Sequence, residues 1–92
     1  MTKKPLLFNV KVAEYGPNYV VLKDELSGDQ MLFSYGSPVA LETPNGFTYL
    51  DERFYKFSPT TGKHRNRFLN EDMVSLNCRI KNKDAAILPY FN

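Results

Sequence analysis

The sequence predicts a mostly β protein of the α+β class: a small antiparallel sheet or barrel with one short basic helix. Three observations predict it. Several segments alternate apolar and polar residues, turn residues recur at close spacing, and one basic stretch lacks the alternation. A chain of 92 residues is too short for two independent cores, so we expect a single domain over residues 1–92.

The first strands are predicted from alternation and from the turns between them. Residues 6–13 alternate through Leu6, Phe8, Val10 and Val12, and the pattern stops at Gly16-Pro17-Asn18. Residues 19–26 and 30–35 flank a Ser27-Gly28-Asp29 turn and predict a hairpin.

A second hairpin is predicted in the middle of the chain. Residues 39–42 and 47–50 flank Thr43-Pro44-Asn45-Gly46, in which proline fixes φ and Asn-Gly tolerates positive φ. The aromatic residues between Arg53 and Phe57 favour a further strand.

The helix is predicted between Thr60 and Asn70. Ser58-Pro59 supplies a capping hydroxyl and a proline suited to the first helical turn. Alternation then returns in residues 74–80 and predicts another strand, and residues 85–88 predict a last edge strand that ends at Pro89.

The apolar phase of these alternating strands predicts the core. Six residues on that phase are expected to be buried: Phe8, Val10, Val21, Phe33, Leu76 and Cys78.

Composition excludes several classes of protein. Seven Phe and six Tyr argue against disorder, and no apolar run approaches the roughly 18 residues of a membrane span. The apolar run that follows the basic residues at the start of the chain ends at Asn9, which is too short for a signal peptide. We therefore expect a soluble cytosolic protein with no membrane partner. One cysteine and one histidine argue against a disulfide framework and a metal site, and we expect no cofactor.

Charge is distributed unevenly along the chain. Residues 53–70 hold five basic and no acidic residues, whereas the rest holds seven basic and ten acidic residues. A segment of charge +5 on a body of charge −3 creates a local positive field. The alternative is a solvated basic helix that only keeps the protein soluble.

This segment is the predicted contact surface for a partner. A helix N-terminus favours anions, and cations and aromatic rings add phosphate contacts and stacking faces. The Gly-Lys pair at residues 62–63 is not a P-loop, because Phe57 and His64 stand where that motif needs glycine and a hydroxyl. The predicted partner-binding residues are Lys63, His64, Arg65, Arg67, Thr60, Thr61, Arg53, Lys56 and Tyr55.

Catalysis is the weaker hypothesis. His64 is the sole histidine, so phosphodiester cleavage would rest on one imidazole supported by Lys63 or Arg65. A Cys78–His64 nucleophile pair would require a strand and the helix to meet. We therefore expect no catalytic residues and no metal ligands, and we expect that the protein is not an enzyme.

The motifs of residues 33–69 resemble a family of small uncharacterised bacteriophage proteins. The resemblance rests on Phe33-Ser34-Tyr35, on Pro38-Val39-Ala40, and on Thr60-Thr61-x-Lys63-His64 at the start of the basic helix. Pro59 and Gly62 depart from that pattern. The resemblance implies a phage or prophage origin and a location in the host cytoplasm, but it implies no activity.

These observations favour a non-enzymatic phage-type accessory protein that binds and modulates a host target through its basic surface. The target would be a nucleic acid or a host protein that handles one, such as a polymerase, a nuclease or a defence complex. A direct DNA- or RNA-binding module, a His64-centred phosphodiesterase and a structural virion protein are the alternatives. If the basic segment is not the site, the exposed face of the hairpin turn at residues 43–46 is the next candidate.

Overall fold

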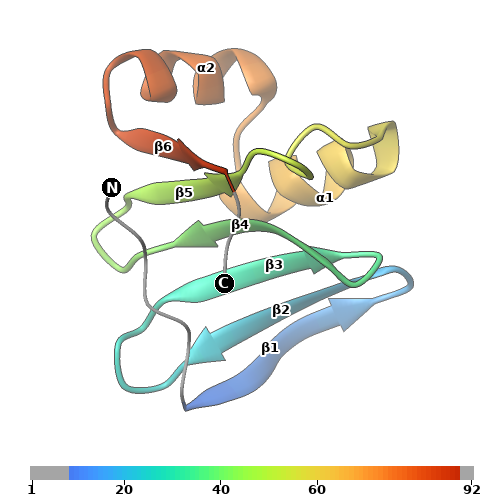
Figure 1. The fold of residues 1–92 in the computed structure, drawn as a ribbon. Coiled ribbons are helices and arrows are strands. Elements are labelled where there is room, and N and C mark those ends of the chain that lie inside the picture. The colour runs from blue at the N-terminus through green and yellow to red at the C-terminus, as the bar shows by residue number, and fades with distance from the viewer. Residues whose placement is uncertain (1–8, 90–92) are drawn as a thin grey trace.

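The computed structural model describes residues 9–89 and shows one six-stranded sheet with two helices (Figure 1). The predicted mostly β class is therefore confirmed. In chain order the elements are β1 (Val10–Gly16), β2 (Tyr19–Asp24), β3 (Gln30–Ser34), β4 (Ser37–Glu42), β5 (Thr48–Asp51), α1 (Pro59–Leu69), α2 (Met73–Lys81) and β6 (Ala85–Leu88).

The sheet is open and mixed, because its strands follow the order β1 to β6 and neither end strand pairs with the other. β1 to β5 form an antiparallel series of hairpins, as predicted, and β6 pairs with β5 in parallel. The barrel alternative is therefore wrong. The parallel pair arises because α1 and α2 together carry the chain back to the starting end of β5.

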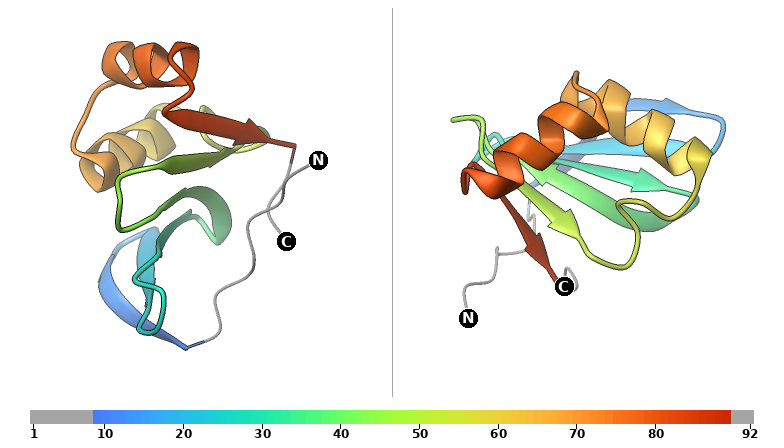
Figure 2. Two further views of the ribbon diagram at one scale, coloured as in Figure 1. Left: turned by 90° about the vertical axis from the view of Figure 1, so that its left-hand side faces the viewer. Right: turned by 90° about the horizontal axis from the view of Figure 1, so that it is seen from above.

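Both helices lie on one side of the sheet, as Figure 2 shows. α1 packs on β3 and β4, and α2 packs on β6. The sheet presents a row of cross-strand neighbours to them, in which Val21 pairs with Leu32, Leu32 with Ala40, and Ala40 with Leu50. These four residues are buried in one cluster with Leu69 of α1 and Leu76 of α2. Burial of this row contributes to stability, since each large apolar side chain contributes roughly 1.5–3 kcal/mol.

The strand predicted over residues 74–80 is wrong, because these residues form α2. Asp72 caps the helix, and its carboxylate accepts a hydrogen bond from the Ser75 amide at 2.9 Å. Met73, Leu76 and Ile80 have the spacing of one helical face and all contact the core cluster. Val74 and Cys78 share the two-residue alternation with Leu76, but both are exposed.

The strand predicted over residues 53–57 is also wrong, because Asp51 folds the chain into turns there. The Asp51 carbonyl accepts from the amides of Phe54 and Tyr55 at 3.1 and 3.0 Å. The Asp51 carboxylate accepts from the amide of Arg53 at 2.9 Å. An aspartate that takes up the next free amides ends a strand, because those amides no longer pair across the sheet.

The core prediction is confirmed for two of its six residues. Val21 and Leu76 are buried, whereas Val10 is 43% exposed on the edge strand β1 and Cys78 is exposed on α2. Phe33 is half-buried and lies on the sheet face opposite the helices. Phe8 lies outside the described residues.

No helix within residues 9–89 is long and apolar enough to cross a membrane.

Arg79 fastens α2 to the β4–β5 hairpin, and its loss is expected to destabilise the fold. Its guanidinium donates to Glu71 Oε1 at 2.7 Å, to the Gly46 carbonyl at 2.6 Å and to Thr48 Oγ1 at 2.9 Å. We expect Arg79→Met to lower the free energy of unfolding by about 2–3 kcal/mol in urea titrations, since these bonds involve a charged donor. Lys81→Met, at an exposed site on the same helix, is the control and should stay within about 0.5 kcal/mol of wild type. Equal stability of the two variants would contradict this role for Arg79.

Glu42 is expected to make stability depend on pH. Burial raises the pKa of the Glu42 carboxyl, Arg79 opposes that shift, and Glu71 adds to it. The folded protein therefore holds this proton more tightly than the unfolded chain, so stability falls as pH rises from about 4.5 through the raised pKa. Glu42→Gln should then be more stable than wild type at pH 7, and the difference should vanish at pH 4. Glu52→Gln removes an exposed carboxylate and serves as the control; if it gives the same pH profile, the effect is one of net charge.

Candidate functional site

α1 presents two of its three Lys and Arg residues on one exposed face. Pro59, Lys63, Arg67 and Asn70 are exposed and follow the helical repeat, whereas Thr61, Arg65 and Leu69 are buried on the opposite side. We call Lys63 and Arg67 the basic ridge. The two cations are four residues apart, which places them on the same face of the helix.

The start of α1 is capped as the sequence predicts. Ser58 is the N-cap, its hydroxyl accepts from the Thr61 amide at 3.1 Å, and Pro59 occupies the first turn. The Thr61 hydroxyl lies inside the protein and shares a hydrogen bond of 3.1 Å with Ser34 Oγ of β3. Thr61 therefore fastens α1 to the sheet, and half-buried Thr60 is the more accessible of the two threonines.

Arg65 is not a surface anchor, contrary to the sequence prediction. It is only 5% exposed, and its guanidinium donates to the Tyr55 carbonyl at 2.5 Å and to Asn66 Oδ1 at 2.9 Å. Burial lowers the pKa of this guanidinium, although an arginine remains protonated in proteins. Tyr55 is buried as well. Two of the nine predicted contact residues thus hold the turns of residues 52–58 against α1.

The turns before α1 carry the remaining basic and aromatic residues of the segment. Arg53 binds the Asp51 carboxylate through two bonds, at 3.1 and 2.9 Å, and lies 4.8 Å from the centre of the Phe54 ring. Phe57 is 69% exposed and contacts Phe54 edge-on. Exposed Lys56 lies over the Tyr55 ring. Among these rings Phe57 is therefore the one accessible for the predicted stacking, whereas Tyr55 belongs to the interior.

His64 joins α1 to the sheet. Its Nδ1 shares a hydrogen bond of 2.9 Å with Ser34 Oγ, and its ring lies 4.9 Å from Tyr19 and 6.3 Å from Tyr35, centre to centre. Burial lowers the pKa of the imidazole, and the charge of Arg67 lowers it further. The imidazole is therefore less readily protonated than a solvent-exposed histidine. Ser34 is only 2% exposed, which closes its hydroxyl to a substrate in this conformation.

Glu14 of β1 borders the basic ridge. Its carboxylate accepts from the Tyr19 hydroxyl at 2.7 Å and lies 3.1 Å from Arg67 Nη2. The hydrogen bond to Glu14 raises the pKa of the Tyr19 phenol. The cavity among these side chains measures about 20 Å³, which is room for roughly one water molecule. A small organic ligand does not fit there.

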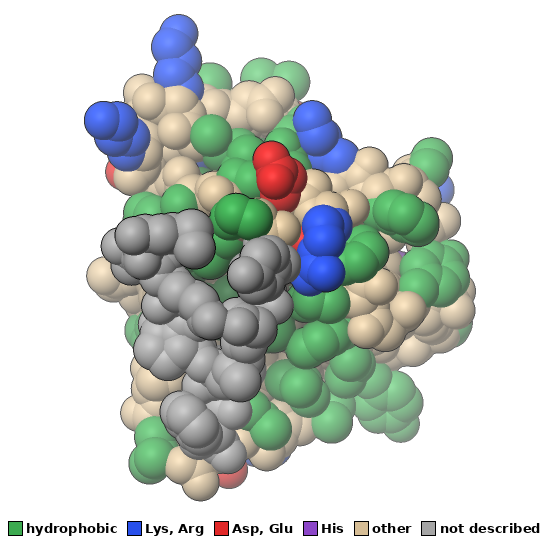
Figure 3. Space-filling view, viewed as in Figure 1, with side chains coloured by type: hydrophobic (Ala, Val, Ile, Leu, Met, Phe, Trp, Pro, Cys, Tyr) green, Lys and Arg blue, Asp and Glu red, His purple; other side chains and the backbone are tan. Residues whose placement is uncertain are grey.

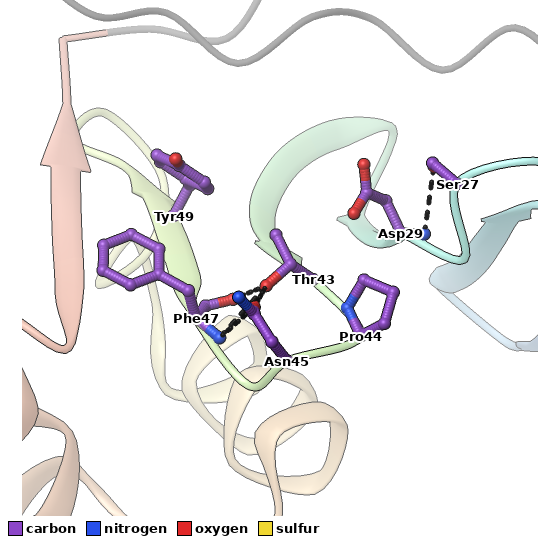
Figure 4. Close-up of a pocket in the computed structure, with 7 residues that line it drawn as sticks. All are labelled: Ser27, Asp29, Thr43, Pro44, Asn45, Phe47 and Tyr49. Carbon is purple, nitrogen blue, oxygen red and sulfur yellow. Dashed lines mark hydrogen bonds between the residues drawn. The ribbon is translucent and has the colours of Figure 1, made fainter.

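A wider depression of about 510 Å³ lies between two hairpin turns, at the place predicted as the next candidate (Figure 4). It is lined by Ser27, Asp29, Thr43, Pro44, Asn45, Phe47 and Tyr49. Several polar groups in it already bond within their own turns, because Thr43 Oγ1 donates to Asn45 Oδ1 and the Phe47 amide donates to Thr43 Oγ1. These groups shape the turn, and α1 remains the better candidate for contact with a charged partner.

The prediction missed Tyr35, which is 55% exposed beside His64. Tyr35 and Gly36 form the two-residue turn between β3 and β4, with φ of 52° and 79°. Two-residue hairpin turns of this type need positive φ at both residues and favour Asn-Gly. A Tyr-Gly pair between two alternating runs is therefore unusual, and this is the sequence signal that marks the position.

Arg65 gives a test of the internal position of its side chain. Arg65→Ala removes bonds from a buried charged donor and leaves the Tyr55 carbonyl without that partner, so we expect the free energy of unfolding to fall by about 2–3 kcal/mol. Lys63→Ala, two residues away on the exposed face, should change it by less than about 0.5 kcal/mol. Thermal and urea unfolding of both variants measure the difference. If Arg65→Ala is as stable as Lys63→Ala, the buried position of the Arg65 side chain is contradicted.

Comparison with known proteins places the chain in a family. No curated protein matches the sequence, and no solved structure matches the fold. The family model of DUF8033, described as a family of unknown function, matches residues 1–84, which is most of the chain. The protein therefore belongs to the DUF8033 family.

Proposed function

We propose that this protein is a non-enzymatic accessory protein that binds and modulates a host target through the basic ridge of α1. The single observation that carries the proposal is the exposed face of α1, which holds Lys63 and Arg67 within an 18-residue segment, 53–70, without an acidic residue. The partner must therefore present an anionic surface. It would be a nucleic acid or a host protein that handles nucleic acids or acts in defence.

The two cations of the basic ridge are accessible to such a partner. Lys63 forms no salt bridge with any other described residue. Arg67 pairs with Glu14, but both side chains are exposed, at 72% and 46%. Exposed pairs of this kind contribute about 0–1 kcal/mol, so an incoming anion can replace the carboxylate at little cost.

The environment of His64 supports a binding role over a catalytic one. The imidazole bonds to a buried serine on β3, and it packs against Tyr19. A general acid or base must reach the proton that it transfers. Here Nδ1 bonds to a hydroxyl that is itself closed to a substrate, and this bond fastens α1 to β3.

The host setting follows from the resemblance to small bacteriophage proteins and is part of the proposal. A phage or prophage protein would meet its target in the bacterial cytoplasm, where nucleic acids and the proteins bound to them are abundant anionic partners. We therefore propose a host polymerase, nuclease or defence complex, or its nucleic acid, as the target.

Removal of the basic ridge is expected to abolish binding without unfolding the protein. Lys63→Gln/Arg67→Gln removes two exposed cations, and Lys81→Gln/Lys83→Gln makes the same change of charge at the end of α2. Immobilised wild type and the α2 variant should capture the same components from bacterial lysate, and the α1 variant should lose them. Parallel captures after nuclease treatment separate nucleic acid from protein partners. Full capture by the α1 variant would show that the ridge is not the site.

A further inference from the structure

We infer that the partner of the basic ridge is a single-stranded nucleic acid whose bases stack on Tyr35 while its phosphates contact Lys63 and Arg67. The inference rests on the proposed function, since it names the partner of the same surface.

The backbone conformation at Tyr35 is the first observation. Tyr35 has φ of 52°, in the left-handed region, where a residue with a large side chain is less stable than glycine or asparagine. Its ring is 55% exposed, so burial of the ring does not offset that cost. The fold alone would favour asparagine here. An exposed aromatic ring kept at a strained position indicates a role outside the folding of this chain.

The rings next to Tyr35 lead directly to the basic ridge. The His64 ring lies 6.3 Å from Tyr35 and 4.9 Å from Tyr19, and the Arg67 guanidinium lies 5.9 Å from the Tyr19 ring, all measured to ring centres. His64 itself is next to Lys63 in the sequence. Tyr35 therefore stands at one end of a row of neighbouring aromatic rings, and a cation of the ridge stands at the other end.

This row is held in place before any partner binds. The Tyr35 amide donates to the Asn18 carbonyl at 2.7 Å, which joins the two neighbouring hairpin turns. Ser34 Oγ bonds to both His64 and Thr61, which fixes the imidazole against β3. A surface that is ordered in advance loses less entropy on binding.

Charge and aromatic faces together match a single strand. Stacking on an exposed ring needs a base with a free face, and proteins that bind single strands combine such rings with cations that follow the phosphates. Lys63 and Arg67 are four residues apart, or about 6 Å along the helix axis. Two stacked nucleotides span a similar length, at about 3.4 Å each.

Oligonucleotide binding by two variants at Tyr35 tests the inference. The probe is a fluorescein-labelled 20-nucleotide oligo(dT), titrated by anisotropy at low salt, with a duplex of equal length as competitor. Tyr35→Phe keeps the ring and should bind as wild type does. Tyr35→Asn suits the turn and removes the ring, so we expect affinity to fall about 5- to 150-fold while stability in urea is unchanged or higher. Tyr35→Gly, which also suits positive φ, should repeat that loss.

Three outcomes would overturn the inference. Undiminished binding by Tyr35→Asn and Tyr35→Gly would exclude stacking on this ring, and equal binding of the duplex would exclude a single-stranded partner. If wild type does not bind the oligo(dT) or a 20-nucleotide oligo(U), but the ridge variant still loses a protein captured after nuclease treatment, the partner is a protein. The proposed function would stand in that last case, and it would fail only if the ridge variant lost nothing.

Discussion

The packing of α1 on the sheet is the contact on which the rest of the surface depends. Thr61, Arg65 and Leu69 follow one another at four-residue intervals and are buried, so the opposite face must point outward. The inner face is only partly apolar: Leu69 joins the core cluster, Thr61 bonds to Ser34, and Arg65 bonds to the Tyr55 carbonyl. Because polar contacts are directional, they fix the rotation of α1 more strictly than apolar contact does, and that rotation places Lys63 and Arg67 outside.

The same rotation divides the positive charge of the segment into internal and external parts. Arg65 neutralises no acid among its hydrogen-bond partners, which are a carbonyl and an amide oxygen. Arg53 is occupied with Asp51. In the space-filling view of Figure 3, lysine and arginine side chains are scattered over the molecule, with no continuous basic surface on the face shown. The proposed contact surface is therefore narrower than the charge count of residues 53–70 suggests, and we expect its selectivity to come from neighbouring groups such as the rings of Tyr35 and Tyr19.

The sequence predicts the hairpins of this fold well, because alternation and turn residues are both local signals. It fails for α2, since Leu76 and Ile80 fit a two-residue and a helical repeat equally, and the capping role of Asp72 decides between them. It also fails for Arg65. The sequence of a helix with few large apolar residues does not show which of its faces is buried. Here hydrogen bonds to Ser34 and to the Tyr55 carbonyl determine the buried face, and both residues are distant in sequence from their partners on α1. Nor does charge patterning point to Tyr35, which is distinguished by its positive φ of 52° and its exposed ring.

In the proposed complex with a nucleic acid, Glu14 would give the two cations of the ridge different roles. Arg67 is held over Tyr19 by the Glu14 carboxylate, so a phosphate that binds Arg67 replaces one anion with another. That exchange contributes little net charge neutralisation. Lys63 has no carboxylate partner among the described residues, so its contact with a phosphate releases counterions in the ordinary way. If the proposed nucleic-acid partner binds here, the salt dependence of binding should therefore arise mainly from Lys63, whereas Arg67 would exchange the Glu14 carboxylate for a phosphate beside the Tyr19 ring.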